Sequence, residues 1–196
     1  MDRAAPRPFL TNLPNVLTYG RILAVPALAA CFLLIKTDQG RWASFAIFAA
    51  ACITDWLDGY LARAWQQQSA LGRMLDPIAD KLLVGTALLL LVYDNTIDTV
   101  TIWAAIIILC REILVSGLRE FLAELNVRIH VTQLTKWKTT LQMLALGVLI
   151  CGPAADKLAP GVLALGTALL WVAALLTLWT GYGYLKAAVR HAIDQR

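Results

Sequence analysis

The sequence has few charged residues and no long polar segment. Of its 196 residues, 59% are hydrophobic, 13 are acidic and 17 are basic. This composition is too apolar for a soluble domain of the same length. Since no polar block stands apart from the apolar ones, we predict one integral membrane domain. The basic residues lie near the ends of apolar segments and do not gather into one soluble face, which argues against nucleic-acid binding.

The sequence also lacks metal-binding and disulfide motifs built from cysteine or histidine. Its four cysteines lie singly in apolar stretches without a CxxC pair, at Cys31, Cys52, Cys110 and Cys151. We therefore expect free thiols that pack as small hydrophobic groups, and neither a zinc site nor a disulfide framework. The two histidines, His130 and His191, have no metal-ligand spacing around them, so we expect both at the solvated surface.

Six apolar segments are separated by short polar connections. Most are close to the roughly 20 residues that a helix needs to cross a bilayer, and helices satisfy their own backbone hydrogen bonds, as lipid requires. We therefore predict an all-α, polytopic membrane protein with six transmembrane helices. The expected spans are residues 13–35, 42–61, 76–93, 100–118, 138–150 and 162–185. The fifth span is short, and we expect it to begin further upstream.

Polar residues predict three of the turns and the limits of the domain. Turn-forming residues occur at 37–40, 94–96 and 152–153. The expected catalytic domain covers residues 13–190, between a cytoplasmic N-terminal segment, 1–12, and a cytoplasmic tail, 191–196. No internal repeat or low-complexity segment divides it further.

Lysine and arginine are distributed unevenly between the two sides of these spans. If the spans alternate in direction, the side with both termini carries 14 of these residues, and the other side carries three, Lys36, Arg41 and Lys157. Cytoplasmic loops hold the excess of positive charge in membrane proteins. We therefore expect both termini in the cytoplasm, with the end of the second span and the start of the third on the cytoplasmic face.

Four aspartates lie where the second span ends and the third begins. Asp55 and Asp58 are three residues apart, and Asp76 and Asp80 are four apart, so each pair shares one face of its helix. Carboxylates near lipid are costly and mark functional sites. Four of them would repel one another in a low dielectric, and oxygen-preferring cations, Mg²⁺ or Mn²⁺, relieve that repulsion. Since paired ions are typical of phosphoryl displacement, we predict a two-metal site held by these aspartates.

The residues beside the aspartates suit a phosphate-bearing ligand. Gly59 and Ala62 have little or no side chain, so a ligand can approach the backbone closely. Arg63 carries a planar fork that matches phosphate oxygens. Pro77 follows an aspartate directly and suits the first turn of the third helix. These neighbours favour a binding site over an isolated group of charges.

A purely structural role is the alternative for the aspartates. Asp76 would then stabilise the N-terminus of the third helix. Asp55 and Asp58 would pair with Arg63 and Arg73 at the membrane interface. One aspartate fits this alternative as well as it fits metal binding. Four aspartates at this spacing, beside glycine and arginine, fit metal binding better.

This arrangement resembles the signature of the CDP-alcohol phosphotransferase family, D-x2-D-G-x2-A-R-x8-G-x3-D-x3-D. The chain matches every fixed position, at Asp55, Asp58, Gly59, Ala62, Arg63, Gly72, Asp76 and Asp80. Residues 12–21, 111–120 and 136–142 resemble further segments of one branch of that family, the bacterial phosphatidylglycerophosphate synthases, so the resemblance covers nearly the whole chain. It implies a six-helix fold of the bacterial inner membrane, usually a homodimer, with two metal ions at the cytoplasmic side.

The resemblance also implies a reaction and roles for the candidate residues. A phosphatidyl group passes from CDP-diacylglycerol to sn-glycerol 3-phosphate, which gives phosphatidylglycerol phosphate and CMP. Asp80 is the expected general base. The residues expected at CDP-diacylglycerol are Asn15, Thr18, Arg21, Gly59, Ala62, Arg63 and Gly72. The residues expected at glycerol 3-phosphate are Arg111, Arg119, Lys136 and Lys138. Glu112 and Glu120 are expected to orient the neighbouring arginines.

Other interpretations remain open at this stage. The acceptor could be phosphatidylglycerol, serine or an inositol phosphate, since the chemistry would be the same. A small cation carrier would also place aspartates in the membrane, but it would spread them through the membrane depth along several spans. The cations of the fourth and fifth spans could be topology signals only. Asn15, Thr18 and Arg21 could simply cap and anchor the first span.

Overall fold

The computed structural model of the chain describes residues 13–65, 70–124 and 133–194, and the side chains of residues 16–57, 72, 74–122, 134 and 137–186. These residues form six α-helices and no strand, which confirms the predicted all-α class. They pack as two compact units, residues 1–90 and 91–196. The expected N-terminal segment, His130 and the side chain of His191 lie outside this description. All four cysteines are free, as predicted.

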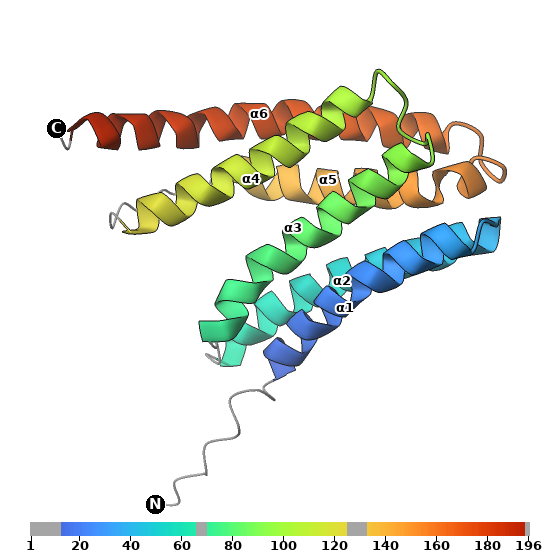
Figure 1. Cartoon of the computed structure of the whole chain (residues 1–196), viewed down its shortest axis with the longest axis horizontal. Coiled ribbons are helices and arrows are strands. Elements are labelled where there is room, and N and C mark those ends of the chain that lie inside the picture. The colour runs from blue at the N-terminus through green and yellow to red at the C-terminus, as the bar shows by residue number, and fades with distance from the viewer. Residues whose placement is uncertain (1–12, 66–69, 125–132, 195–196) are drawn as a thin grey trace, which may run out of the picture. The chain divides into compact units, whose positions relative to one another are not determined.

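In the first unit, α1 (Leu13–Leu34) and α2 (Asp38–Trp65) form a hairpin of neighbouring helices (Figure 1). The apolar side chains of Leu28, Phe32 and Phe48 are buried. The connection is shorter than the predicted turn over residues 37–40, because α2 already begins at Asp38. The Thr37 hydroxyl accepts a hydrogen bond from the Gly40 amide at 3.3 Å, so Thr37 caps the first turn of the helix.

The third helix, α3 (Ala70–Tyr93), starts earlier than predicted. The expected start at Asp76 is wrong, and Pro77 lies inside the helix and not in its first turn. Proline removes one helical hydrogen bond, but polar side chains and neighbouring helices compensate for this loss in membrane helices. Asp76 and Asp80 therefore lie within α3. Stabilisation of a helix N-terminus does not explain Asp76.

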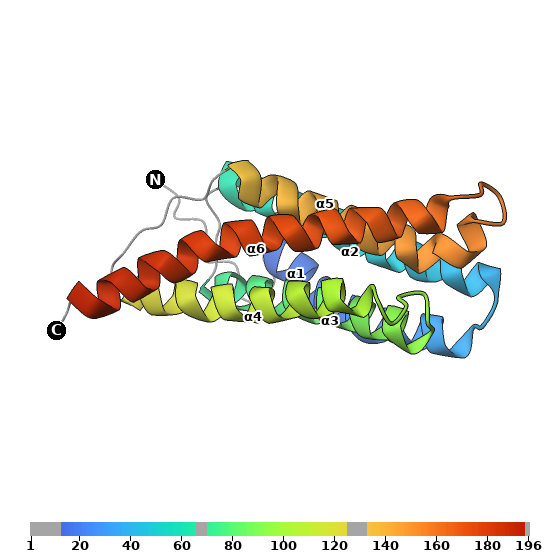
Figure 2. The same cartoon turned by 90° about the horizontal axis from the view of Figure 1, so that it is seen from above.

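In the second unit, α6 (Val162–Asp194) packs against both α4 (Ile102–Glu124) and α5 (Gln133–Ala155), as Figures 1 and 2 show. A Cβ atom at Gly166 would lie 2.9 Å from a methyl carbon of Leu149, so this glycine allows α5 and α6 to approach closely. The α5 helix begins upstream of the expected fifth span, as predicted.

The α5 helix also continues further than predicted. It passes through Gly152 and Pro153, so the predicted turn at residues 152–153 is wrong. The chain turns after α5 instead, where Asp156 accepts hydrogen bonds from the amides of Gly161 at 2.9 Å and Leu163 at 3.1 Å. Gly161 has a φ of 98°, which glycine adopts without a side-chain clash. These capping interactions end one helix and start the next.

The connection between α3 and α4 contains the turn predicted at residues 94–96. Asn95 has a positive φ of 57°, which asparagine tolerates better than most residues. Asp98 accepts a hydrogen bond from the Thr101 amide at 2.7 Å. Hydrogen bonds from the Thr101 side chain and amide hold the pKa of Asp98 below its usual value. The ionised form of Asp98 therefore favours the start of α4.

Three stretches among the described residues are long and apolar enough to cross a membrane by length and composition, Val16–Leu34, Trp137–Ala155 and Val162–Lys186. They belong to α1, α5 and α6. Large apolar side chains such as Leu175 and Trp179 are exposed on α6, which suits contact with lipid. The other three helices carry the predicted site aspartates and three of the predicted site arginines within their length.

Candidate active site

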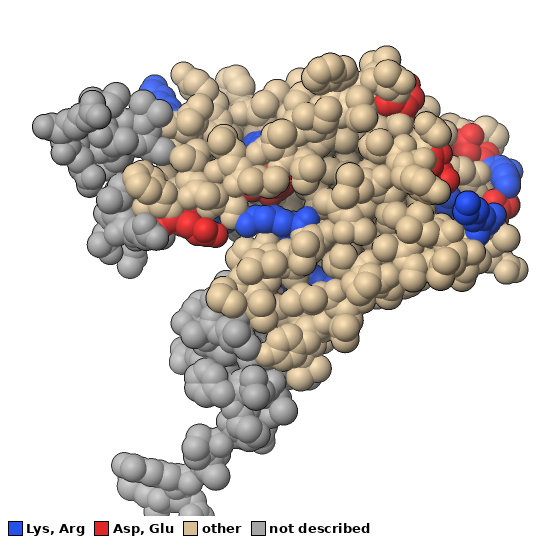
Figure 3. Space-filling model, in the orientation of Figure 1, with Lys and Arg blue, Asp and Glu red and all other residues tan. Residues whose placement is uncertain are grey.

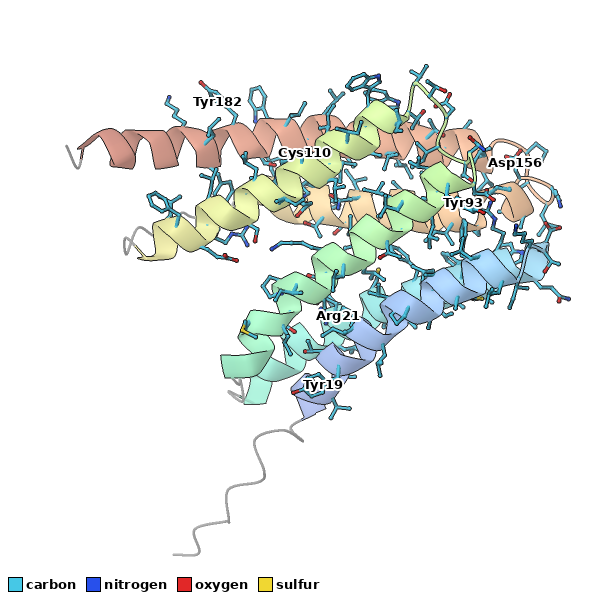
Figure 4. The ribbon with its side chains drawn as sticks, viewed as in Figure 1. Tyr19, Arg21, Tyr93, Cys110, Asp156 and Tyr182 are labelled. Carbon is cyan, nitrogen blue, oxygen red and sulfur yellow. The ribbon has the colours of Figure 1, made fainter. Side chains whose placement is uncertain are left out.

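Arg21 of α1 joins two of the predicted metal ligands in the first unit. One guanidinium nitrogen, Nη1, lies 2.6 Å from Oδ1 of Asp55 and 2.9 Å from Oδ1 of Asp80. The two carboxylate oxygens thus share one cationic partner and lie close to each other. Figure 4 shows Arg21 among the helices of this unit. One carboxylate of α2 and one of α3 therefore meet at Arg21, whereas the sequence predicts that all four aspartates come together.

Thr18 holds the third described aspartate. Its hydroxyl donates a hydrogen bond to Oδ1 of Asp76 at 2.7 Å. Thr18 and Arg21 are three residues apart on α1, so they lie on one helix face, and their partners Asp76 and Asp80 lie on one face of α3. We call Asp55, Asp76 and Asp80, with Thr18 and Arg21, the acidic cluster.

Burial differs between the two halves of the acidic cluster. The Arg21 side chain is fully buried, whereas the side chains of Asp55 and Asp80 are 42% and 40% exposed. Thr18 is also buried. The carboxylates are therefore open on the side away from the guanidinium. A ligand can reach them without passing Arg21.

The donors of the acidic cluster suit a divalent cation, although they do not form a metal site in the described arrangement. Within the part of the chain that the structure describes, no group of three or more histidine, cysteine, aspartate or glutamate residues is placed to hold a metal ion. The contacts give the reason, because Asp55 and Asp80 face Arg21 and Asp76 faces Thr18. The donors are carboxylate oxygens, which Mg²⁺ and Mn²⁺ prefer, and two of them already share a cation. Their chemistry therefore fits the predicted ions.

Several predicted site residues lie outside the described side chains. They are Asn15, Asp58, Gly59, Ala62, Arg63 and Lys136. The backbone places Asp58 to Arg63 on α2 and Lys136 on α5. Gly72, the remaining residue of the signature, is buried on α3. Roles for these residues remain predictions.

Arg111 is the most firmly held of the predicted phosphate ligands in the second unit. Its Nε donates a hydrogen bond to the Thr177 carbonyl at 3.1 Å, and its Nη2 donates one to the Thr180 hydroxyl at 2.9 Å. Both partners belong to α6. Gly181 follows directly, and a Cβ atom there would lie 3.2 Å from Cγ of Arg111. The α6 helix thus provides both the anchor and the space for this arginine.

Glu112 connects Arg111 to the second predicted cation. Lys138 of α5 donates a hydrogen bond from Nζ to Oε1 of Glu112, and Nη1 of Arg111 lies 3.6 Å from the same oxygen. Both cations are buried. Glu112 therefore lies beside Arg111 as expected, but its hydrogen bond goes to a lysine on another helix. A buried cation needs such a partner, because an uncompensated charge costs several kcal/mol.

Arg119 lies further along α4 and has a different partner. Its guanidinium carbon is 5.6 Å from the ring centroid of Tyr184 on α6, a cation–π contact. Arg119 is exposed, whereas Tyr184 is buried. We call Arg111, Glu112, Arg119 and Lys138 the basic cluster. On the face shown in Figure 3, charged side chains occupy only a few places, and most of the surface carries none.

The partner residues on α6 were not predicted. Thr177, Thr180, Gly181 and Tyr184 follow the spacing i, i+3, i+4 and i+7, which is one face of a helix. A face of small and polar residues inside an apolar span is the signal that could have identified them. On α5, Gln142 is buried, and its Oε1 has no hydrogen-bond partner among the described residues.

Comparison with known proteins agrees with the motif. Residues 11–179 match the family model described as CDP-alcohol phosphatidyltransferase. A protein of Rickettsia bellii is 44% identical over 180 residues, which cover 92% of this chain and 97% of the relative. Proteins of Haemophilus influenzae and Cereibacter sphaeroides are 41% and 37% identical, over 93% and 94% of this chain and 96% and 99% of the relatives. All three are named CDP-diacylglycerol–glycerol-3-phosphate 3-phosphatidyltransferase.

Proposed function

Because this chain belongs to the CDP-alcohol phosphatidyltransferase family, we propose that it transfers a phosphatidyl group from CDP-diacylglycerol to sn-glycerol 3-phosphate. The family membership makes it a membrane-bound transferase and not a cation carrier. The products are phosphatidylglycerol phosphate and CMP. Relatives that carry the name of this reaction align with more than nine tenths of the chain. This extent supports the same acceptor.

The observation that carries the chemistry is the meeting of Asp55 and Asp80 at one cationic group. A diphosphate ester is a poor electrophile while its negative charges are uncompensated, so the site must supply positive charge. Asp55, Asp58, Asp76 and Asp80 would hold two Mg²⁺ or Mn²⁺ ions. When bound, the ions would neutralise the diphosphate and the charge that develops on the leaving CMP.

In the proposed reaction, the 1-hydroxyl of glycerol 3-phosphate attacks the phosphorus that carries the diacylglycerol. The new P–O bond forms as the bond from this phosphorus to the oxygen of the CMP phosphate breaks. Asp80 accepts the hydroxyl proton as general base. Its side chain is 40% exposed, so an acceptor alcohol can reach it. Asp55 and Asp76 orient the site beside it.

The basic cluster is the proposed binding site for the phosphate of glycerol 3-phosphate. Of its three cations, Arg111 and Lys138 contact the carboxylate of Glu112. The third, Arg119, lies over the Tyr184 ring. An excess of positive charge held inside an apolar unit favours a multiply charged anion. Arginine forks bind phosphate oxygens in pairs. We assign Lys136, whose side chain is not described, to the same site on the basis of the sequence.

The nucleotide end of the donor is assigned to the residues around the signature. Gly59, Ala62 and Gly72 leave room for the ligand, and Arg63 binds the diphosphate. Asn15 completes this group on α1. Thr18 and Arg21 are bonded to aspartates, so they act on the ligand through the acidic cluster or after a rearrangement.

The proposal includes a location and an assembly. The chain lies in the bacterial inner membrane with both termini in the cytoplasm, as the excess of Lys and Arg on that side supports. It forms a homodimer, as the family resemblance implies. Labelling of cysteines introduced at Lys36 and Lys157 in intact cells tests the orientation. Mass measurement of the purified protein in detergent micelles tests the dimer.

A panel of acceptor alcohols tests the reaction. The purified full chain is given CDP-diacylglycerol in mixed micelles, Mg²⁺ or Mn²⁺, and one acceptor at a time: glycerol 3-phosphate, serine, an inositol phosphate or phosphatidylglycerol. Release of CMP is measured. We expect release with glycerol 3-phosphate, because the basic cluster favours a soluble phosphorylated acceptor. Release with another acceptor only would replace the acceptor and leave the transferase chemistry intact.

A further inference from the structure

We propose that Arg21 is a built-in competitor of the divalent cations for Asp55 and Asp80. The guanidinium holds the two carboxylates together when the metal is absent, and it must give up at least one of them when the metal binds. Arg21 is thus a positioning residue: it holds the two carboxylates, and its competition with the metal ions lowers their affinity. This inference rests on the proposed metal-binding role of the aspartates.

The geometry places the guanidinium where a shared cation would act. One nitrogen of Arg21 contacts Oδ1 of both carboxylates, at 2.6 Å and 2.9 Å. Asp55 and Asp80 would hold a metal ion through carboxylate oxygens of the same two groups. Charged hydrogen bonds of this length are among the stronger ones in proteins. Binding of the metal therefore has to replace an existing interaction.

Burial indicates that the exchange can occur without unfolding of the unit. Arg21 is covered on its own side, whereas about two fifths of the Asp55 and Asp80 side chains are exposed. A cation can approach the carboxylates from the exposed side while the guanidinium still contacts them. The carboxylates then lose their contact with Arg21 while they keep their positions.

The charges of the acidic cluster favour the exchange. The acidic cluster contains three carboxylates and one guanidinium, so negative charge remains in excess. Asp55 and Asp80 contact the guanidinium, and Asp76 is held by the Thr18 hydroxyl. A divalent ion compensates more of this charge than the guanidinium does. The apparent affinity for metal is nevertheless reduced by the fraction of molecules in which Arg21 still occupies the carboxylates. Removing the guanidinium should therefore tighten metal binding.

Titration with Mn²⁺ tests the inference without measuring catalysis. The full chain is purified in detergent and stripped with a chelator, and bound Mn²⁺ is followed by electron paramagnetic resonance. We expect Arg21→Gln to bind Mn²⁺ about 10- to 100-fold more tightly than the wild type, as the loss of charge-assisted hydrogen bonds predicts. Arg21→Lys, which keeps the charge, should change the affinity less.

Arg41→Gln is the matched control. It removes the same charge from the same unit, but Arg41 lies over the Phe32 ring at 4.4 Å and stands near the start of α2, 14 residues before Asp55. We expect its Mn²⁺ affinity to equal that of the wild type within about twofold, since salt screens charges that lie further apart than a Debye length. Tighter binding in both variants would mean a general charge effect and would overturn the inference.

Thermal unfolding provides a second readout. In chelator, Arg21→Gln should unfold at a lower temperature than the wild type, because its carboxylates repel one another without a counter-ion. Saturating Mn²⁺ should raise the unfolding temperature of the variant by more than it raises that of the wild type. Equal increases, or unchanged Mn²⁺ affinity in Arg21→Gln, would overturn the inference.

The proposed function can fail separately. If Asp80→Asn abolishes Mn²⁺ binding while Arg21→Gln leaves it unchanged, the aspartates are metal ligands and Arg21 is no competitor. If Asp80→Asn binds Mn²⁺ as the wild type does, Asp80 is not a metal ligand, and both the inference and the metal site at Asp80 are wrong.

Discussion

The acidic cluster of the first unit and the basic cluster of the second unit handle charge in opposite ways. In the acidic cluster, one buried guanidinium contacts two partly exposed carboxylates, and the Thr18 hydroxyl holds the third. In the basic cluster, one carboxylate contacts two buried cations, and the third cation, Arg119, lies over the Tyr184 ring. Each cluster contains one group of the opposite sign, which holds it together but leaves it undercompensated.

This difference indicates which ligand each cluster lacks. Charged groups inside apolar helices are retained only when partners compensate their desolvation. If an internal partner compensated the charge of a cluster fully, a ligand of opposite charge would gain little by binding there. The uncompensated negative charge of the acidic cluster favours cations, and the uncompensated positive charge of the basic cluster favours a phosphate. The same principle thus predicts two ligands of opposite charge within one chain.

The largest expected effect concerns the acidic cluster. Asp80→Asn keeps the shape of the side chain and can still accept a hydrogen bond from Arg21, but it removes the charge and the base. CMP release should fall by about 10²- to 10⁴-fold, the usual contribution of a general base, or further if metal is also lost. Asp94→Asn, in the exposed α3–α4 turn, should release CMP at the wild-type rate. Full activity in Asp80→Asn would rule out the proposed base.

A smaller effect is expected from the anchor of the basic cluster. In Gly181→Ala, the new methyl group would lie 3.2 Å from Cγ of Arg111. Arg111 cannot easily move aside, because Thr177 and Thr180 hold its guanidinium. Overpacking of this kind costs about 1–3 kcal/mol. We expect the KM for glycerol 3-phosphate to rise by roughly tenfold, while the KM for CDP-diacylglycerol stays constant.

Gly183→Ala is the control for this substitution. A Cβ atom at Gly183 would have no neighbour within 4 Å, and alanine favours a helix over glycine by roughly 0.5–1 kcal/mol. This variant should be as stable as the wild type or slightly more stable, with unchanged KM values. If Gly181→Ala and Gly183→Ala behave alike, α6 does not position Arg111.

The sequence predicted the elements and the faces of the acidic cluster better than its partners. Spacings of three and four residues place Asp55 and Asp58, and Asp76 and Asp80, on single helix faces wherever the helices begin. Asp55 and Asp80 therefore meet even though α3 begins earlier than predicted. The cationic partner could not be predicted from spacing. The nearby Arg63 was the candidate partner of Asp55, whereas the observed partner, Arg21, is far away in sequence and is brought close by tertiary packing.

Two helix limits were wrong for a related reason. Pro77 and Pro153 are residues that usually mark a helix start or a turn in soluble proteins. Both lie inside helices here, because apolar surroundings leave the backbone no water to bond and favour a continuous helix. The residues that do end α5, such as Asp156 and Gly161, act through hydrogen bonds across the turn, which composition alone does not reveal.

The smallest expected effect separates the two parts of one tyrosine in the basic cluster. The hydroxyl of Tyr184 is buried and has no hydrogen-bond partner among the described residues, whereas its ring lies under Arg119. Tyr184→Phe should therefore be neutral or slightly stabilising, because it removes an unsatisfied polar group. Tyr184→Leu also removes the cation–π contact, worth about 0.5–1 kcal/mol at exposed sites. It should raise the KM for glycerol 3-phosphate about two- to fivefold. A loss of affinity in Tyr184→Phe would instead mean that the hydroxyl itself binds the acceptor, and that the basic cluster includes a neutral donor.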